Sequence, residues 1–292
     1  MVADAEPDVS VIVPAYDESG AIVDVLERIN ETMRQTGRSF EIIVVDDGST
    51  DGTAKLCQQV KGVRVIAHGQ NRGTGAARTT GVRASTGRYL VMIDADGTYP
   101  VDAIPSLLDC LETCDMVIGA RTREAGTLRW LRTFAKEAIR LLACYLTETH
   151  IPDLNSGLRA MRRELVEAYL PLLPNTHSWV STITMAALSG GYHVEWLPIP
   201  YYKRVGRSTF HPIRDTYNYL VLVIRSIMYF NPLKVFLPVS AALFALGFGK
   251  AIWDFALHGF RVASATVMLI LSAVQILALG FLGDLVARRG RS

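Results

Sequence analysis

The sequence is poor in cysteine and carries almost no excess charge of either sign. Its 292 residues include four cysteines, none in a Cys-x-x-Cys pair, and no histidine pair has zinc-ligand spacing, so a zinc-binding fold is not expected. We expect Cys110 and Cys114 to be free thiols in the core. The formal net charge of +2 argues against a nucleic-acid-binding protein, which would normally present a basic face. Residues 1–8 are acidic and lack an apolar core, so no cleavable signal peptide is expected there.

Apolar residues make up 50% of the chain, a high share for a soluble protein, and they are unevenly distributed. Up to about Arg225, charged and apolar segments alternate as in a soluble α/β protein. Beyond Arg225, charge nearly vanishes. The length allows one large domain or two smaller ones, and the change in composition indicates a soluble part followed by a membrane part.

The soluble part alternates β-branched runs with segments of helical spacing. The expected strands are Val9–Pro14, Phe40–Val45, Val63–Ala67, Arg88–Ile93 and, later, Asp115–Ala120. The expected helices are Ala21–Met33, about Asp51–Val60 with Ser49 or Thr50 as its cap, and a segment that ends near Ser85. This alternation predicts an α/β fold with a mostly parallel, Rossmann-like sheet and helices on both of its faces.

Polar loops follow the predicted strands, and ligands of such sheets bind beyond the carboxyl ends of the strands. The loops are Tyr16–Ser19, Asp46–Ser49, Asn71–Gly75 and Asp94–Thr98. Asp94 and Asp96 stand on alternate positions after an apolar run, so their side chains point to the same side of an extended segment. Paired carboxylates suit a hard divalent cation, whereas the alternative is a solvated loop.

Two C-terminal segments reach membrane length, Leu233 to about Trp253 and Val262–Gly283. Each has about 20 residues, enough to cross a hydrocarbon core of about 30 Å, and the short link between them predicts a helical hairpin. A hydrophobic hairpin buried in a soluble protein is the alternative. Basic residues cluster before the first segment and after the second, whereas only Arg261 lies between them. We therefore expect a two-span membrane anchor, with the N-terminal domain and both termini in the cytoplasm.

Two further segments are predicted to be amphipathic helices. Residues 127–148 carry an apolar stripe flanked by basic residues, and this helix either packs on the domain's own core or lies on the membrane surface. Its stripe also offers a contact face for a homo-oligomer. The aromatic residues at both ends of 212–231 suit a helix at the membrane interface. The expected organisation is a domain over 1–211, an interfacial helix over 212–231, two transmembrane helices over 232–287 and a basic tail over 288–292.

Four short motifs occur in order along the soluble part, at Val11–Glu18, Val44–Asp51, Asn71–Gly73 and Asp94–Asp96. Together they resemble the signatures of glycosyltransferase family 2, which has the GT-A fold, and the resemblance covers roughly residues 8–215. With two membrane segments behind it, the chain is most similar to the polyprenyl-phosphate glycosyltransferases. That branch includes dolichyl-phosphate mannose synthase and bacterial undecaprenyl-phosphate glucosyltransferases.

The resemblance implies a nucleotide-sugar site. The residues that match nucleotide-binding positions are Pro14, Tyr16, Glu18, Asp46, Gly75, Arg78 and Asp94. A carboxylate such as Asp46 can accept a hydrogen bond from a base N–H, and an aromatic ring can stack on the base. Asp47 is expected to serve the turn. Gly73 and Gly75 either let the backbone approach a ligand closely or are ordinary turn glycines.

Asp94 and Asp96 match the family's binding pair for Mg²⁺ or Mn²⁺, and Asp96 is the expected direct ligand. Relatives in the mannose synthase branch often carry glutamine where this chain has Thr98. Whether the protein supplies a third ligand to the metal ion is therefore left open.

The resemblance also implies an acceptor site rich in arginine, because guanidinium groups bind phosphate oxygens in pairs. The candidates for the acceptor phosphate are Arg121, Arg132, Arg207 and Ser208, and Arg204 matches a catalytic position near the diphosphate. Asp153, Asn155 and Ser156 match an Asp-x-x-Ser-Gly-x-Arg element that positions acceptor and sugar. The segment Ser178–Thr184 lacks a carboxylate to act as general base. A phosphate monoester, with a second pKa of about 6, needs none.

The implied activity is an inverting, metal-dependent transfer of a hexose from a UDP- or GDP-sugar to undecaprenyl or dolichyl phosphate. Asp94, Asp96, Arg121 and Arg204 are its expected catalytic residues. Three alternatives remain. One is transfer to the hydroxyl group of another membrane lipid, and another is a catalytically inactive membrane scaffold. The third is a processive polysaccharide synthase, against which the missing downstream motifs and the presence of two expected spans argue.

Overall fold

The computed structural model describes residues 6–122, 141, 144, 149–203, 232–258 and 263–289. The chain forms two compact units, Met1–Tyr219 and Leu220–Ser292, and each is considered by itself. Several predictions lie outside the described residues: the interfacial helix 212–231, nearly all of the helix 127–148, and the candidate site residues Arg132, Arg204, Arg207 and Ser208.

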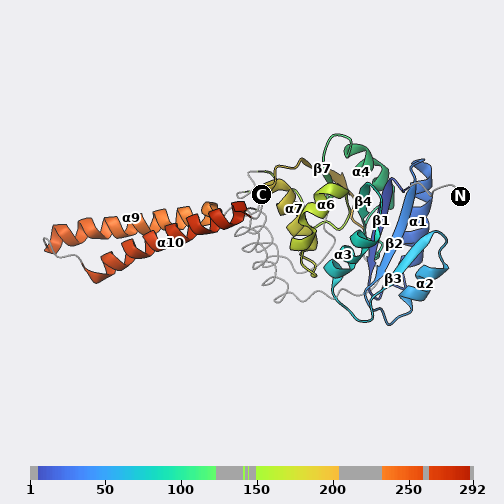
Figure 1. Ribbon diagram of the computed structural model, residues 1–292, viewed down its shortest axis with the longest axis horizontal. Helices are drawn as coiled ribbons and strands as arrows, with labels where there is room; N and C mark the ends of the chain where they lie inside the picture. The colour runs from blue at the N-terminus through green and yellow to red at the C-terminus, as the bar shows by residue number, and fades with distance from the viewer. Residues whose placement is uncertain are drawn as a thin grey trace. The chain divides into compact units, whose positions relative to one another are not determined.

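The first unit is built on a seven-stranded sheet with the order β3-β2-β1-β4-β6-β5-β7 (Figure 1). The strands are β1 Val9–Ala15, β2 Phe40–Asp46, β3 Val63–Ala67, β4 Tyr89–Met92, β5 Met116–Arg121, β6 Arg159–Arg162 and β7 Val194–Ile199. Strand β6 runs antiparallel to both of its neighbours, β4 and β5, whereas the other pairs are parallel. The prediction of a mostly parallel sheet is therefore confirmed.

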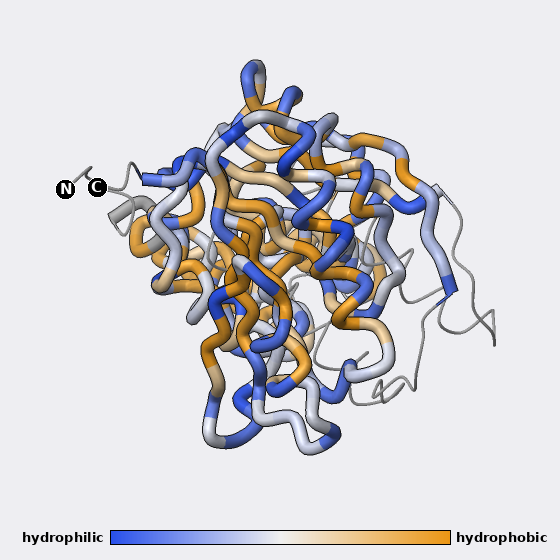
Figure 2. Tube along the Cα trace, turned by 90° about the vertical axis from the view of Figure 1, so that its right-hand side faces the viewer, coloured by the Kyte–Doolittle hydropathy of each residue, from blue (hydrophilic) through white to orange (hydrophobic). Residues whose placement is uncertain are grey.

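Helices cover both faces of this sheet. They are α1 Ile22–Gln35, α2 Thr53–Gln59, α3 Thr74–Ala84, α4 Ile104–Cys110, α6 Arg163–Tyr169 and α7 Trp179–Ser189, with short 3₁₀ turns η1 Val101–Ala103 and η2 Leu170–Leu172. Successive residues of β1 serve opposite faces, as the two-residue period of a strand requires. Val11 packs in the core cluster that contains α1 and α4, whereas Ile12 packs with α3, α6 and α7. Strands β1, β2 and β4 are largely buried, and hydrophobic stretches alternate with hydrophilic ones along the chain trace (Figure 2).

The start of α2 differs from the prediction. The helix begins at Thr53, its N-cap is Gly52 with a φ of 93°, and no side chain caps it, so the prediction of Ser49 or Thr50 as the cap was wrong. Ser49 and Thr50 instead form hydrogen bonds with Asp17. The backbone N–H of Asp17 donates to Ser49 Oγ, and the backbone N–H of Thr50 donates to Asp17 Oδ1.

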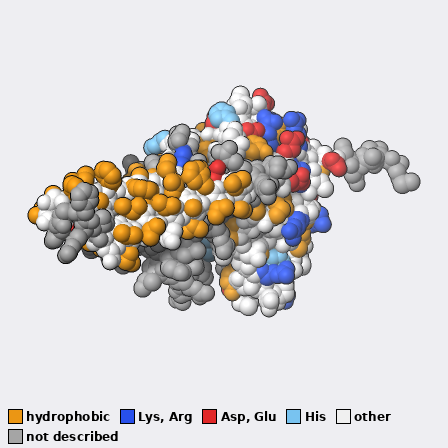
Figure 3. All heavy atoms as spheres, turned by 60° about the vertical axis from the view of Figure 1, so that its left-hand side comes forward, with side chains coloured by type: hydrophobic (Ala, Val, Ile, Leu, Met, Phe, Trp, Pro, Cys, Tyr) orange, Lys and Arg blue, Asp and Glu red, His pale blue; other side chains and the backbone are white. Residues whose placement is uncertain are grey.

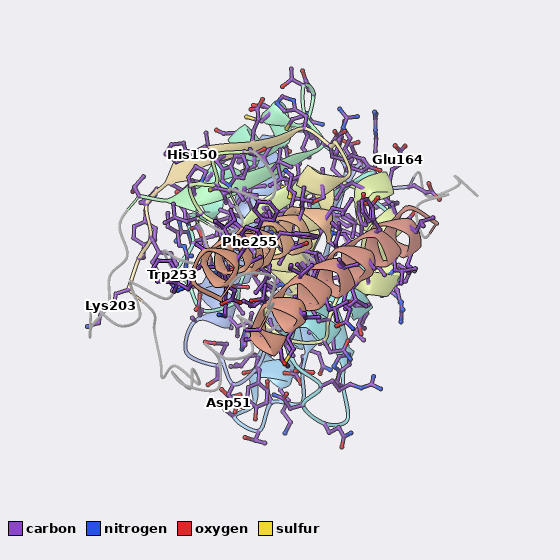
Figure 4. All side chains as sticks on the ribbon, turned by 90° about the vertical axis from the view of Figure 1, so that its left-hand side faces the viewer. Asp51, His150, Glu164, Lys203, Trp253 and Phe255 are labelled. Atoms are coloured by element: carbon purple, nitrogen blue, oxygen red, sulfur yellow. The ribbon has the colours of Figure 1, made fainter. Side chains whose placement is uncertain are left out.

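The second unit is a pair of long apolar helices, α9 Leu233–His258 and α10 Ser264–Arg289. Two stretches, Leu233–Leu257 and Ser264–Val286, are long and apolar enough to cross a membrane, and only 11% and 17% of their most apolar windows is buried. Hydrophobic side chains cover the visible face of the pair (Figure 3). Trp253 and Phe255 stand out from α9 and are largely exposed (Figure 4). Such apolar exposure disfavours a hairpin buried in a soluble protein.

The two helices are joined by close packing and by a polar cluster near their turn. Gly247 lies against Ile270, and Gly280 against Phe236, where a larger residue would not fit. Near the turn, the carboxylate of Asp254 accepts hydrogen bonds from Lys250 Nζ at 3.0 Å and Thr266 Oγ1 at 2.6 Å. These contacts hold the predicted hairpin together.

Candidate active site

The loops that follow β1 and β2 are bound to each other. Asp17, which has a φ of 52°, lies between the two loops and exchanges hydrogen bonds with the Ser49–Thr50 turn. The backbone N–H of Glu18 donates to Thr53 Oγ1 at 3.0 Å, which extends the contact to the start of α2. Tyr16, which directly follows β1, is exposed, and its aromatic ring could stack on a flat ligand.

Asp46 ends β2 with an unsatisfied acceptor. Its Oδ2 accepts the backbone N–H of Ser49 at 3.2 Å, whereas its Oδ1 is buried and has no hydrogen-bond partner among the described residues. A buried acceptor without a donor destabilises the fold by about 1–3 kcal/mol. An incoming N–H group would remove that deficit, and the role of Asp46 in binding a base stays a prediction.

Asp47 serves the protein itself. Its carboxylate accepts hydrogen bonds from the backbone N–H groups of Arg72 and Gly73 at 2.9 and 2.8 Å. It also lies 2.7 Å from Nδ1 of the buried His68, whose Nε2 contacts Thr80 Oγ1 at 3.0 Å. The expected structural role of Asp47 in the turn therefore agrees with the geometry.

Gly73 and Gly75 admit a neighbouring loop. A Cβ atom at either position would overlap backbone carbonyl groups of the loop at 174–176. The N–H groups of Gly75 and Ala76 both donate to the carbonyl oxygen of Asn175, at 3.1 and 3.2 Å. The first turn of α3 thus binds this loop through its N–H groups, which favours the turn role over direct ligand contact for Gly75.

Asp94 is enclosed by groups from two other elements. Arg78 Nη2 on α3 donates to Asp94 Oδ1 at 2.7 Å, and Gly157 lies directly against the carboxylate. The backbone N–H of Gly157 in turn donates to the hydroxyl oxygen of Tyr99 at 2.7 Å. Burial and then the charge of Asp94 raise the pKa of Tyr99, which therefore stays a neutral phenol. The sequence identified Asp94 and Arg78 as site residues, whereas it included Gly157 only in the Asp-x-x-Ser-Gly-x-Arg element and gave it no contact with Asp94.

Asp96 is fixed by a tight turn with Thr98. The backbone N–H and the hydroxyl of Thr98 both donate to Asp96 Oδ1, at 3.1 and 2.6 Å. Among the described residues, no group of three or more His, Cys, Asp or Glu side chains is assembled to hold a metal ion. Asp94 and Asp96 supply hard oxygen ligands of the kind that Mg²⁺ and Mn²⁺ prefer. The two carboxylates fit a hard divalent cation and would hold it beside the end of β4.

Arg121 and Asp153 form a two-point ion pair at the end of β5. Nε and Nη2 of Arg121 donate to the two carboxylate oxygens of Asp153, at 2.6 and 2.9 Å. Burial alone would raise the pKa of Asp153, but the hydrogen bond and charge of Arg121 outweigh it, and the pKa is lowered. The guanidinium also lies over the ring of Tyr201, 5.2 Å from its centroid. Two residues that the sequence assigned to separate tasks are thus direct partners.

Asn155 and Ser156 belong to the same segment, which is bound to α7 through Asn155 and to β6 through Ser156. Ser181 Oγ donates to Asn155 Oδ1 at 2.8 Å, and Ser156 offers its carbonyl oxygen to Arg159 Nη2. Arg159 is fully buried, and its Nη1 donates to Val180 O at 2.8 Å and Thr184 Oγ1 at 3.0 Å. Burial, together with the nearby charge of Arg78, lowers the pKa of Arg159 to about 9. The segment therefore connects Asp94, Arg121 and α7, a role that its sequence pattern did not reveal.

The fold and this edge define a class of protein: an α/β enzyme of GT-A type, with carboxylates and arginines gathered where the parallel strands end. The family profile described as Glycosyl transferase family 2 matches residues 10–170, more than half of the chain. A second profile, described as GtrB C-terminal hairpin, matches residues 231–288. The chain belongs to glycosyltransferase family 2 and is a glycosyltransferase.

Two relatives illustrate its similarity. One is an undecaprenyl-phosphate 4-deoxy-4-formamido-L-arabinose transferase from Pseudomonas aeruginosa, 29% identical over 295 aligned positions that cover 96% of this chain and 85% of the relative. The other is a dolichyl-phosphate hexose transferase from Haloferax volcanii, 33% identical over 207 positions that cover 70% of this chain and 87% of the relative.

Solved structures support the fold. The structure of glucosyl-3-phosphoglycerate synthase from Mycobacterium tuberculosis with phosphoglyceric acid has a TM-score of 0.60 at 23% identity, over 75% of this chain and 80% of the other. The same enzyme with Mn²⁺ and UDP-glucose has a TM-score of 0.58 at 24% identity, over 76% and 78% of the two chains. At this level of identity the likeness establishes the GT-A-like fold alone.

Proposed function

We propose that the protein transfers a hexose, with inversion, from a nucleotide sugar to a polyprenyl phosphate such as undecaprenyl or dolichyl phosphate. The proposal depends on one observation: the same chain contains a glycosyltransferase family 2 unit and a C-terminal hairpin of the GtrB type. The names of the two relatives specify undecaprenyl phosphate and dolichyl phosphate, which are both lipid phosphates. An acceptor of this kind resides in the membrane that α9 and α10 are suited to enter.

The composition of α7 supports an acceptor that is already anionic. This helix packs beside the Asn155–Arg159 segment, and its residues Trp179–Ser189 include no Asp, Glu or His. A hydroxyl acceptor would need a base to remove its proton, whereas a phosphate monoester, with a second pKa of about 6, is a nucleophile at neutral pH. The composition of α7 thus supports a lipid phosphate over a lipid alcohol as the proposed acceptor.

On the donor side, we assign the nucleoside to the edge formed by the ends of β1 and β2. Asp46 accepts a base N–H through its unsatisfied oxygen, Tyr16 stacks on the base, and Pro14 and Glu18 complete the pocket. Arg78, held by Asp94, faces the diphosphate. The unsatisfied Oδ1 of Asp46 supports this assignment most directly.

A divalent cation, Mg²⁺ or Mn²⁺, would be held by Asp96 with Asp94 beside it. Its contribution is to neutralise the charge that develops on the departing nucleoside diphosphate. Arg204, in the segment before the hairpin, is proposed to add a positive charge to the same group.

The chain's own residues act on the acceptor. A phosphate oxygen of the lipid forms a bond to the anomeric carbon while the bond from that carbon to the nucleoside diphosphate breaks, so an α-linked donor gives a β-linked product. Arg121 is proposed to bind the acceptor phosphate, together with Arg132, Arg207 and Ser208. Asp153 orients Arg121 through the two-point ion pair, and Asn155 and Ser156 line the sugar.

The proposed organisation follows the sequence. Residues 1–211 form the catalytic domain, with residues 127–148 and 212–231 as interfacial helices, 232–287 as the membrane hairpin and 288–292 as a basic tail. The distribution of basic residues supports a cytoplasmic catalytic domain and cytoplasmic termini. The apolar stripe of residues 127–148 remains a proposed contact for a homo-oligomer.

The test is a donor screen with the purified full-length protein in detergent. UDP- and GDP-hexoses are offered with undecaprenyl phosphate, dolichyl phosphate, the corresponding polyprenols and diacylglycerol, and the released nucleotide and the lipid product are identified by mass. We expect transfer to the phosphates and none to the alcohols, and loss of transfer in Asp96→Ala. Transfer to an alcohol would overturn the acceptor assignment, and the absence of transfer from every donor would favour the inactive scaffold.

A further inference from the structure

The tripeptide Asp-Gly-Thr occurs at residues 51–53 and again at 96–98, and both copies fold in the same way. The middle glycines have positive φ angles, 93° at Gly52 and 72° at Gly97. In each copy the threonine N–H donates to Oδ1 of the aspartate, at 3.0 Å in the first and 3.1 Å in the second. The threonine hydroxyl donates to the same oxygen, at 2.5 and 2.6 Å.

Two donors on one carboxylate oxygen restrict the rotation of the carboxylate and stabilise its ionised form. The first copy illustrates the effect. Burial raises the pKa of Asp51, but the hydrogen bonds from Thr53 and Ser19 outweigh it and bring the value to about 2. Asp51 lies in the loop beyond β2 (Figure 4), so this turn shapes the start of α2.

The second copy stands at the candidate metal site. Thr98 is almost completely buried, at 1% exposure, and Asp96 is at 8%. We propose that Thr98 is a positioning residue, which fixes the Asp96 carboxylate for the cation through its hydroxyl group and is not itself a metal ligand. This inference rests on the proposed metal-binding role of Asp96. It also answers a question raised by the sequence, which is whether Thr98 is a third protein ligand of the metal ion.

The consequence of losing the hydroxyl follows from the geometry. Thr98→Val keeps the shape and the backbone N–H but removes the shorter of the two hydrogen bonds to Oδ1. Outer residues that orient a metal ligand typically change metal affinity by about 10- to 100-fold when they are removed. We therefore expect Mn²⁺ affinity to fall about 10-fold in Thr98→Val, and Thr98→Ser, which keeps the hydroxyl, to bind Mn²⁺ like the wild type.

The matched control is Thr53→Val. It removes the equivalent hydroxyl from the other Asp-Gly-Thr turn, so it reproduces the loss of thermal stability caused by breaking such a turn. The same hydroxyl accepts the backbone N–H of Glu18 beside the proposed nucleotide site, so this control is compared in the titration without nucleotide. Because Asp51 is not a candidate ligand, Thr53→Val should lower the melting temperature without a matching loss of Mn²⁺ affinity under that condition. The pair of variants separates damage to a turn from damage to the metal site.

The experiment titrates Mn²⁺ into the full-length protein without nucleotide, and in parallel with UDP and with GDP, and follows the free ion by electron paramagnetic resonance. Wild-type affinity in Thr98→Val, or an equal loss in Thr53→Val when no nucleotide is present, would overturn the positioning role. Asp96→Ala is measured alongside. If it also binds Mn²⁺ like the wild type, the proposed metal site fails, whereas loss in Asp96→Ala with none in Thr98→Val refutes the role of Thr98 alone.

A thiol substitution separates positioning from direct coordination. If Thr98 were a ligand, Thr98→Cys would place a soft sulfur on the ion and would favour Cd²⁺ over Mn²⁺. A positioning residue predicts weaker Mn²⁺ binding in Thr98→Cys and no gain in Cd²⁺ affinity over the wild type. A gain in Cd²⁺ affinity would show that residue 98 contacts the metal and would overturn the proposal.

Discussion

Arg121 and Asp153 face each other across a two-point ion pair, with Nε to Oδ2 at 2.6 Å and Nη2 to Oδ1 at 2.9 Å. Both side chains are largely buried, at 12% and 8% exposure. The pair joins the end of β5 to the segment that leads into β6, and it fixes the plane of a guanidinium that we assign to the acceptor phosphate. In a buried pair, removal of one partner leaves the other charge uncompensated.

Asp153→Asn should therefore weaken acceptor binding more than donor binding. The amide removes the negative charge and one of the two acceptors, so Arg121 loses its fixed orientation. We expect the KM for polyprenyl phosphate to rise about 10-fold, and the free energy of unfolding to fall by about 3 kcal/mol. The measurements are steady-state kinetics with each substrate varied in turn, and thermal unfolding in detergent.

The control for this prediction is Asp102→Asn. Asp102 forms an exposed ion pair with Arg28 at 3.4 Å, and such surface pairs contribute about 0–1 kcal/mol. Asp102→Asn should leave both KM values and the melting temperature near the wild type. A rise confined to the KM for the nucleotide sugar in Asp153→Asn would contradict the acceptor role of the pair.

The same pair predicts how stability depends on pH. The pKa of Asp153 is lowered in the folded protein from an ordinary value of 3.8. A carboxyl group whose folded pKa is depressed stabilises the protein above its unfolded pKa, and that contribution is lost as pH falls through the folded pKa. The difference in melting temperature between wild type and Asp153→Asn should be constant from pH 7 to about 5 and should shrink below about 3.8. A difference that grows toward low pH would contradict the ion pair.

Much of the sheet and of its binding edge could be predicted because the signals are local. The strands β1 to β4 are short apolar runs followed by polar turns, and Asp46, Asp94 and Asp96 stand where those runs end. The helix α7 and the strand β6 could not be placed in the same way. Trp179 is fully buried among residues from several other elements. Arg159 is a charged residue type that is normally exposed, but residues distant in sequence bury it completely.

Partnerships in the site escaped prediction for the same reason. The sequence pattern identified Asp153 and Arg121 separately. The residues that flank each of them in the sequence do not indicate that the C-terminal end of β5 contacts the segment before β6. The glycines of the Asn71–Gly75 turn indicated that another group lies close to the backbone there. They did not indicate that this group is the carbonyl of Asn175. Local patterns thus report where a group stands along the chain, whereas packing decides what it contacts.

Gly157→Ala should damage the site through Asp94. A Cβ atom at residue 157 would lie 2.6 Å from Cγ of Asp94, so the carboxylate that accepts the hydrogen bond of Arg78 must shift. A misplacement of about 1 Å in a catalytic group can reduce activity roughly 100-fold, and overpacking destabilises by about 1–3 kcal/mol. We expect a large loss of kcat/KM in radiolabelled transfer assays, with a modest loss of thermal stability.

Gly69→Ala is the matched control. A Cβ atom at Gly69 would meet nothing within 4 Å among the described residues, and its backbone does not have a positive φ. The same substitution there should leave activity and melting temperature unchanged. If Gly157→Ala transferred sugar at the wild-type rate, the position of Asp94 against Gly157 would have no catalytic importance.

The orientation of the hairpin can be tested with single cysteines. Basic residues cluster before α9 and in the last turn of α10, so the turn between the helices should cross to the far side of the membrane. Ser264 is the first residue of α10 and is exposed, whereas Ser106 is exposed on α4 of the catalytic unit. In a chain whose four native cysteines are replaced by serine, Ser264→Cys should react with a membrane-impermeant maleimide on intact cells. Ser106→Cys should react only after the cells are permeabilised, and the reverse pattern would put the catalytic unit outside the cytoplasm and away from its nucleotide-sugar supply.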